Sequence, residues 1–201
     1  PAQPATEKQP FVIPISIGLV GVPDSDRLFV LTEAESSVTF TDVAEEPVPS
    51  ILRGFSAPVV LDFAYTDAQL LTLFAQDTDP FNRWEAGQRL MLRSALNAIQ
   101  SDAKNAELAS VNAINSDLIA ALRHLLRDTY LDAAFKELAL TLPSETYIAE
   151  QLEVVDPQRI HAVREAMRLQ MAQALRADWE WAFETHRENG AYQPDVVSAG
   201  R

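Results

Sequence analysis

The sequence predicts an α+β fold: a small antiparallel β-sandwich, followed by an irregular array of antiparallel α-helical hairpins such as starts an α-solenoid-like domain. Before residue 65, apolar residues alternate with a period of two, as in half-buried strands. After it they recur every three or four residues, as in amphipathic helices. The 201 residues suffice for one large domain or two small ones. We therefore expect a linker over residues 1–9, a β-sandwich domain over residues 10–65, and a truncated helical domain over residues 66–201. The β-sandwich is either complete or lacks one edge strand.

Five short runs predict the strands. In the run over residues 11–19, large apolar residues occupy every second position from Phe11 to Leu19, and Pro14 lies among them. Because proline cannot donate to a strand ladder, Pro14 predicts an edge strand or a bulge. The other runs are rich in β-branched or aromatic residues and are separated by turn-forming clusters; they cover residues 28–32, 38–43, 51–55 and 59–63.

Capping residues locate the first helices. Thr66 and Gln69 form a capping box that opens a helix to about residue 76. Asp79 caps the next helix, and Pro80 stands at its first position, where the absent N–H costs nothing. This second helix should run to about residue 100, followed by a polar loop or frayed end over residues 101–112.

Further helices follow with short connections, which predict antiparallel packing. A third should begin at Asn115 or Ser116, a fourth should end near Pro143, and Ser144 should cap a short fifth. The longest helix should run from Asp156 to about residue 190. Its expected core stripe is Ile160, Val163, Met167, Met171, Leu175, Trp179 and Phe183.

Composition excludes several function classes. The chain has 16 Lys and Arg residues against 29 Asp and Glu residues, for a formal net charge of −13. Binding to nucleic acid or to an anionic membrane surface is therefore disfavoured. The absence of cysteine excludes disulfides, thiol catalysis and thiolate metal sites. No apolar run approaches the ~18 residues of a membrane span, so we expect a cytoplasmic protein.

The histidines do not have the spacing of a zinc site. A helical zinc motif needs a second histidine four residues away with an adjacent glutamate, and His124, His161 and His186 all lack that neighbour. We expect all three to be surface or packing residues. The glycines are scattered, so no phosphate-binding loop is predicted, and no Gly-x-Ser-x-Gly elbow occurs.

The densest carboxylates are the pair Glu45 and Glu46, and the group Asp77, Asp79 and Glu85. Paired carboxylates can act in acid–base catalysis, but negative charge at a helix start is more often structural. We expect structural roles for them.

Two aromatic positions leave alternatives open. Arg83, Trp84 and Glu85 could form a ligand-binding cluster, but Trp84 at a helix start is more often core with its charged neighbours in solvent. Trp181 lies off the stripe of its helix and either anchors an interface with another domain or covers a neighbouring loop.

Several segments, in order, resemble the bacterial aminopeptidase N family of zinc-dependent gluzincin aminopeptidases. The most specific is Pro-Val-Pro-Ser-Ile-Leu-Arg-Gly-Phe-Ser-Ala-Pro-Val over residues 47–59, followed at the right distance by Asp-Pro-Phe-Asn-Arg-Trp-Glu-Ala-Gly-Gln over residues 79–88. Weaker matches are residues 7–15, 30–35, 39–43, 140–144, 155–157 and 163–166. The resemblance covers residues 7–201.

This resemblance implies a catalytic function for the whole enzyme and a non-catalytic one for this chain. The family removes N-terminal residues from peptides with one zinc ion, held by a His-Glu-x-x-His helix and a distant glutamate, and anchors the substrate amine on a Gly-x-Met-Glu-Asn loop. Neither motif occurs here. We therefore expect no catalytic, cofactor-binding or metal residue in this chain, and zinc only in the parent enzyme.

The chain should thus be an inactive, non-catalytic fragment that scaffolds the active site and restricts access to it, in contact with a catalytic domain outside it. Its ends, at Pro1 and Arg201, look like cuts within a longer protein. The alternative is a stand-alone helical-array module that binds a peptide or protein partner.

Overall fold

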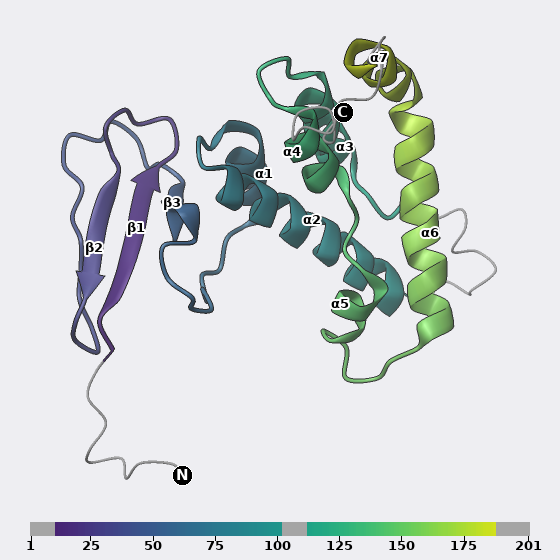
Figure 1. The fold of residues 1–201 in the computed structure, drawn as a ribbon. Coiled ribbons are helices and arrows are strands. Elements are labelled where there is room, and N and C mark those ends of the chain that lie inside the picture. The colour runs from purple at the N-terminus through teal and green to yellow at the C-terminus, as the bar shows by residue number, and fades with distance from the viewer. Residues whose placement is uncertain (1–10, 102–111, 188–201) are drawn as a thin grey trace, which may run out of the picture. The chain divides into compact units, whose positions relative to one another are not determined.

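A computed structural model describes residues 11–101 and 112–187. The chain divides into two compact units, residues 1–83 and 84–201. Antiparallel strands come first and helices follow, which confirms the predicted fold class (Figure 1).

The strands of the first unit form one sheet. Its order is β2(Arg27–Leu31), β1(Ile13–Leu19), β3(Pro49–Ile51), and both pairings are antiparallel (Figure 1). Ile15 lies opposite Phe29 on one side of β1, and Gly18 lies opposite Ser50 on the other.

β1 is the central strand of the sheet, but at Pro14 it pairs only with β2 and without a bulge, so the predicted edge position holds locally. Proline is tolerated there for a local reason. The pairing with β3 covers only Ile17 to Leu19, and the Ser16 N–H on that side donates to Ser56 Oγ at 2.9 Å. Since N–H groups two residues apart point to the same side of a strand, Pro14 lacks its N–H where no strand would receive it.

Two predicted strands, residues 38–43 and 59–63, are irregular in the structure, and the run 51–55 is a strand only at its start. Asp42 has a φ of 61°, which interrupts an extended backbone. Tight turns bracket the second run, since Val59 N–H donates to Ala57 O and Tyr65 N–H to Phe63 O. Val60 is 96% exposed, so this run has no sheet to pack against.

The first two helices begin as predicted. Helix α1(Asp67–Gln76) has Thr66 as N-cap and the complete capping box with Gln69. Helix α2(Pro80–Gln100) begins after Asp79, whose Oδ1 accepts from the Asn82 N–H at 2.8 Å. Of the loop predicted at 101–112, residues 102–111 lie outside the described residues.

Helices α3 and α5 also have the predicted starts, whereas the start of α4 was not predicted. Asn115 caps α3(Ser116–Arg127), Asp132 caps α4(Ala133–Leu140) and Ser144 caps α5(Glu145–Ala149). Helix α3 packs against α4 and α7, and α6 packs against α5 and α7. The core of this second unit contains large side chains that are almost fully buried: Met91, Leu118, Leu122, Leu125, Ile148, Ile160, Met167 and Leu175.

The longest predicted helix is two helices, α6(Pro157–Ala174) and α7(Arg176–His186). They meet at Leu175, whose φ of −111° and ψ of 16° are not helical. Arg123 of α3 stabilises the break, because its Nη2 donates to Ala174 O at 2.8 Å. The change of direction moves the C-terminal end of the predicted stripe outward, and Phe183 is 67% exposed instead of buried. The predicted stop at residues 189–190 lies outside the described residues.

Among the described residues, no helix combines the length and the apolar character needed to cross a bilayer.

Candidate functional site

A buried polar network connects β3 with the start of α2 in the first unit. Asp77 Oδ2 accepts from Ser50 Oγ at 2.6 Å, and its Oδ1 accepts from Arg53 Nη1 at 2.7 Å. Asn82 Nδ2 donates to Ser50 Oγ at 2.7 Å and to Ile51 O at 3.0 Å. The side chain of Asp77 is 1% exposed, so these are charge-assisted bonds away from water.

This network holds an unusual stretch of backbone. Leu52, Gly54 and Phe55 have φ values of 61°, 61° and 51°. The left-handed region costs a non-glycine residue about 1–2 kcal/mol. Asp79 helps to offset that cost, because its Oδ2 accepts from the Gly54 N–H at 2.8 Å while its other oxygen caps α2.

The polar groups of the network are hydrogen-bonded to one another and to the backbone. Every buried side-chain nitrogen and oxygen of the described residues has a hydrogen-bond partner. The carboxylates of Asp77 and Asp79 are engaged with an arginine and with backbone N–H groups. Their role is therefore structural, and the predicted cap at Asp79 is confirmed. The role of Asp77 as the partner of Arg53 is new.

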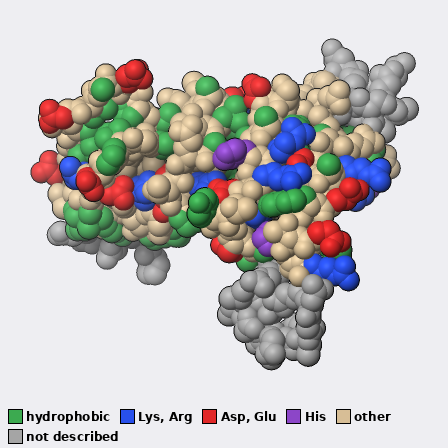
Figure 2. Space-filling view, turned by 90° about the horizontal axis from the view of Figure 1, so that it is seen from above, with side chains coloured by type: hydrophobic (Ala, Val, Ile, Leu, Met, Phe, Trp, Pro, Cys, Tyr) green, Lys and Arg blue, Asp and Glu red, His purple; other side chains and the backbone are tan. Residues whose placement is uncertain are grey.

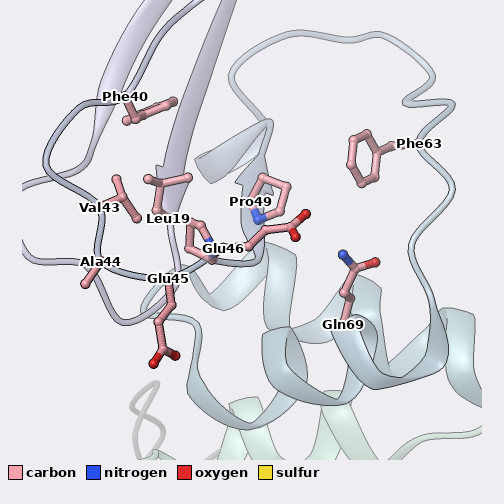
Figure 3. Close-up of a pocket in the computed structure, with 10 residues that line it drawn as sticks. Leu19, Phe40, Val43, Ala44, Glu45, Glu46, Pro49, Phe63 and Gln69 are labelled. Atoms are coloured by element: carbon pink, nitrogen blue, oxygen red, sulfur yellow. The ribbon is translucent and has the colours of Figure 1, made fainter.

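An open groove of about 530 Å³ lies next to β3 in the same unit. Its exposed lining is about half polar and half apolar, and Glu45, Glu46 and Gln69 are its polar residues; the apolar lining residues are Leu19, Phe40, Val43, Ala44, Pro47, Pro49 and Phe63. Figure 3 shows the Glu46 carboxylate directed into the space beside Pro49, whereas Glu45 points away from it. A carboxylate in such a groove can receive a cationic side chain.

The outer face of the sheet is apolar and exposed. Val12, Leu28 and Val30 are 67%, 67% and 46% exposed. Leu28 and Val30 lie opposite Ser16 and Pro14, so they project from one face. Residues 11–83 contain three arginines against eleven acidic residues. On the face shown in Figure 2, hydrophobic side chains gather over the strand-bearing part with acidic side chains around them.

Within residues 11–101 and 112–187, none of the three histidines belongs to a group of side chains that could hold a metal ion. His124 is exposed on α3. His161 Nδ1 lies 2.8 Å from Glu145 Oε1, and His186 Nε2 lies 3.3 Å from Lys136 Nζ. Zinc ligands donate lone pairs to a cation, so a lysine amine beside His186 does not form a zinc site with it.

The cluster at the start of α2 is split between different roles. Arg83 is buried, with Nε donating to Phe74 O at 3.1 Å, so the prediction that it lies in solvent is wrong. Trp84 is half-buried, and Glu85 pairs with Arg89 one turn later.

Trp181 is covered by cations of the second unit. Arg127 lies 4.7 Å and Lys136 lies 5.7 Å from its ring centroid, which are cation–π distances. These contacts join Trp181 to α3 and α4, and its role in an interface with another domain stays a prediction.

Two ionisable groups beside Trp181 have shifted pKa values. Burial alone would raise the pKa of Asp178, but hydrogen bonds from Arg127 and Arg123, at 2.7 and 3.0 Å, hold this pKa below its usual value. Burial lowers the pKa of Lys136, against the opposing effect of Asp128 and Asp132. Neither group faces an assembled catalytic neighbour, so both shifts belong to packing.

The described residues do not fit the zinc ion that the family resemblance implies for the parent enzyme. They contain no group of three His, Cys, Asp or Glu side chains that could hold a metal ion. That the chain contains no catalytic, cofactor-binding or metal residue stays a prediction.

Comparison with known proteins identifies the family to which the chain belongs. Residues 67–201 match a family described as a domain of unknown function (DUF3458_C) with ARM repeats, and residues 1–64 match a domain of unknown function (DUF3458) with an Ig-like fold. The chain belongs to the DUF3458_C family, with the Ig-like domain preceding its helical part.

The individual relatives are aminopeptidases. The chain is 37% identical over 176 residues to aminopeptidase N of Caulobacter vibrioides and 34% identical over 188 residues to that of Escherichia coli, and each match covers 87% of the chain. The crystal structure of Legionella pneumophila aminopeptidase A in complex with aspartic acid matches 92% of the chain with a TM-score of 0.73 and 25% identity. The chain spans only about a fifth of the length of these relatives. The family resemblance stated from the sequence is confirmed.

Proposed function

We propose that this chain is a non-catalytic structural part of an aminopeptidase N-type enzyme, which removes N-terminal residues from peptides with a zinc ion held elsewhere in the polypeptide. The observation that carries the proposal is the aminopeptidase relationship over most of this chain, combined with its match to only about a fifth of each relative. Its role is to support the active site and to restrict access to it.

The polar network supports a scaffold role. It consists of satisfied hydrogen bonds that join β3 to the start of α2 and hold a strained turn. Such a cluster rigidifies the surface that it underlies, as a docking platform requires.

The outer sheet face and the acidic groove are the proposed contact surfaces with the catalytic domain. An exposed apolar face on a sheet is normally covered by another element. The groove, with Glu45 and Glu46, suits a lysine or arginine side chain of that domain. A cytoplasmic location, expected from the sequence, belongs to this proposal as well.

The first experiment assays the 201-residue chain on an aminoacyl anilide with added zinc. We expect no turnover above buffer, because the described residues offer no metal-binding group. Turnover that co-purifies with the chain and is abolished by a chelator would overturn the proposed role.

The second experiment tests docking in the longer polypeptide that contains this segment. Leu28→Asp should lower its aminopeptidase activity or thermal stability, because a charge on a covered apolar face leaves an uncompensated buried group. Val60→Asp is the matched control, since Val60 is 96% exposed in the same unit and lies outside the sheet. Equal behaviour of the two variants would contradict docking through this face.

The alternative function, a stand-alone helical array that binds a peptide or protein, is favoured by one observation, the ARM-repeat description of the matching family. Helical arrays use extended surfaces for such partners. Nanomolar binding of a natural partner by this chain alone would select this alternative.

A further inference from the structure

A small pocket of about 350 Å³ lies in the second unit between the end of α4, helix α6 and helix α7. Its floor is apolar and firmly packed: Leu140, Leu142 and Met171 are 7%, 8% and 5% exposed. Trp179 lines the α7 side and is half-buried. The volume is at the lower end of the range of small-molecule sites in proteins.

The charged groups that line this pocket are two guanidinium groups. Arg164 donates from Nε to Pro143 O at 2.9 Å, and its Nη atoms make no hydrogen bond to any described residue. Arg168 uses Nε and Nη2 on Glu165, the latter at 2.6 Å. No acidic residue lines the pocket itself.

This arrangement defines a ligand by its chemistry. Glu165 is hydrogen-bonded to Arg168 and also feels the charge of Arg164, so the two guanidinium groups and this one carboxylate leave a net positive charge. The bond from Arg164 Nε to Pro143 O orients the guanidinium group, whose Nη atoms keep their N–H donors. A planar guanidinium matches a carboxylate, and the apolar floor matches an alkyl chain. The net charge of −13 does not prevent this, because at physiological ionic strength the field of distant acids is screened within about 8 Å.

We propose that this pocket binds an apolar carboxylate, with the carboxylate on the Arg164 Nη atoms and the alkyl group over Leu142 and Met171. The ligand is either the C-terminal residue of a peptide or a free short-chain acid. This site is independent of the proposed scaffold role, because no contact with the first unit enters it.

The test is an NMR titration of the 201-residue chain with N-acetyl-leucine, N-acetyl-leucinamide and hexanoate. We expect saturable shifts of the Met171 methyl and Trp179 indole signals with N-acetyl-leucine, with a Kd on the order of 1 mM as for a small fragment. The amide, which lacks the charge, should bind at least about fivefold more weakly. Comparable binding of hexanoate assigns a free acid, and its failure to bind assigns a peptide C-terminus.

Two variants complete the test. Arg164→Met should weaken N-acetyl-leucine binding about fivefold or more, whereas Arg176→Met, which removes an exposed arginine paired with Glu180, should leave it unchanged. Because Arg164→Met also removes the bond to Pro143, Ala172→Phe provides a second variant that fills the pocket and keeps Arg164. Equal binding of acid and amide, shifts centred outside the pocket, or no saturation at about ten times the expected Kd would each overturn the proposal.

Discussion

Replacing Asp77 by asparagine should open the first unit locally. The substitution keeps the shape of the side chain but removes the charge that receives Ser50 and Arg53 at 2.6 and 2.7 Å. Breaking a buried ion pair costs about 3–5 kcal/mol, and Arg53 keeps partial partners in Asp26 at 3.3 Å and Thr78. We therefore expect the lower end, about 3 kcal/mol.

Hydrogen exchange measured by mass spectrometry can localise that loss. Peptides covering β1 and residues 47–56 should exchange roughly a hundredfold faster in Asp77→Asn, since each 1.4 kcal/mol is a factor of ten. Tryptophan fluorescence would not report it, because Trp84, Trp179 and Trp181 all lie in the second unit.

Asp62→Asn is the matched control, because it makes the same chemical change at an exposed position of the same unit. Exchange in Asp77→Asn within about twofold of that control would show that the network does not stabilise this backbone, and the reasoning would fail.

Three further predictions concern other parts of the chain. Asp178→Asn should cost about 2 kcal/mol in urea unfolding at neutral pH; because the folded pKa of Asp178 is lowered, the cost should fade as the pH drops through that pKa, and a constant cost would contradict the role of charge. Lys136→Met should leave the unfolding free energy at pH 7 unchanged or raise it, since burial lowers the pKa of Lys136. Wild-type stability should rise relative to this variant as the pH increases towards 10.5, and a variant less stable at pH 7 would refute this. Leu28→Lys should reduce any self-association of the chain seen by light scattering without lowering its melting temperature; unchanged association would exclude the outer sheet face.

Local signals accounted for the helix starts. The Thr66 and Gln69 capping box, and the caps at Asp79, Asn115 and Ser144, involve atoms within three residues of each other. Such bonds depend on little beyond local sequence, so the sequence predicts them well.

The features that the sequence did not predict depend on contacts between residues far apart in the chain. Leu175 continues the apolar period of α6, and the donors that stabilise the break come from Arg123 and Arg127, about 50 residues earlier. Residues 59–63 have strand composition, but a strand requires a partner, and none is present for this run among the described residues.

Only part of the polar network could be predicted from the sequence. Asp79 was found because capping is a local pattern, whereas the pairing of Asp77 with Arg53 joins residues 24 positions apart. One signal was available: the two stretches that most resemble aminopeptidase N, residues 47–59 and 79–88, contribute Ser50, Arg53, Asp79 and Asn82 to the network.

The polar network also bears on where this protein can be cut. The Ig-like family match ends at residue 64, yet Ser50 and Gly54 bond to side chains at positions 77, 79 and 82. A polypeptide that ended at Ala64 would keep the strained turn and lose the groups that hold it. For expression or domain exchange, the β-rich part should therefore be taken together with α1 and the first turn of α2.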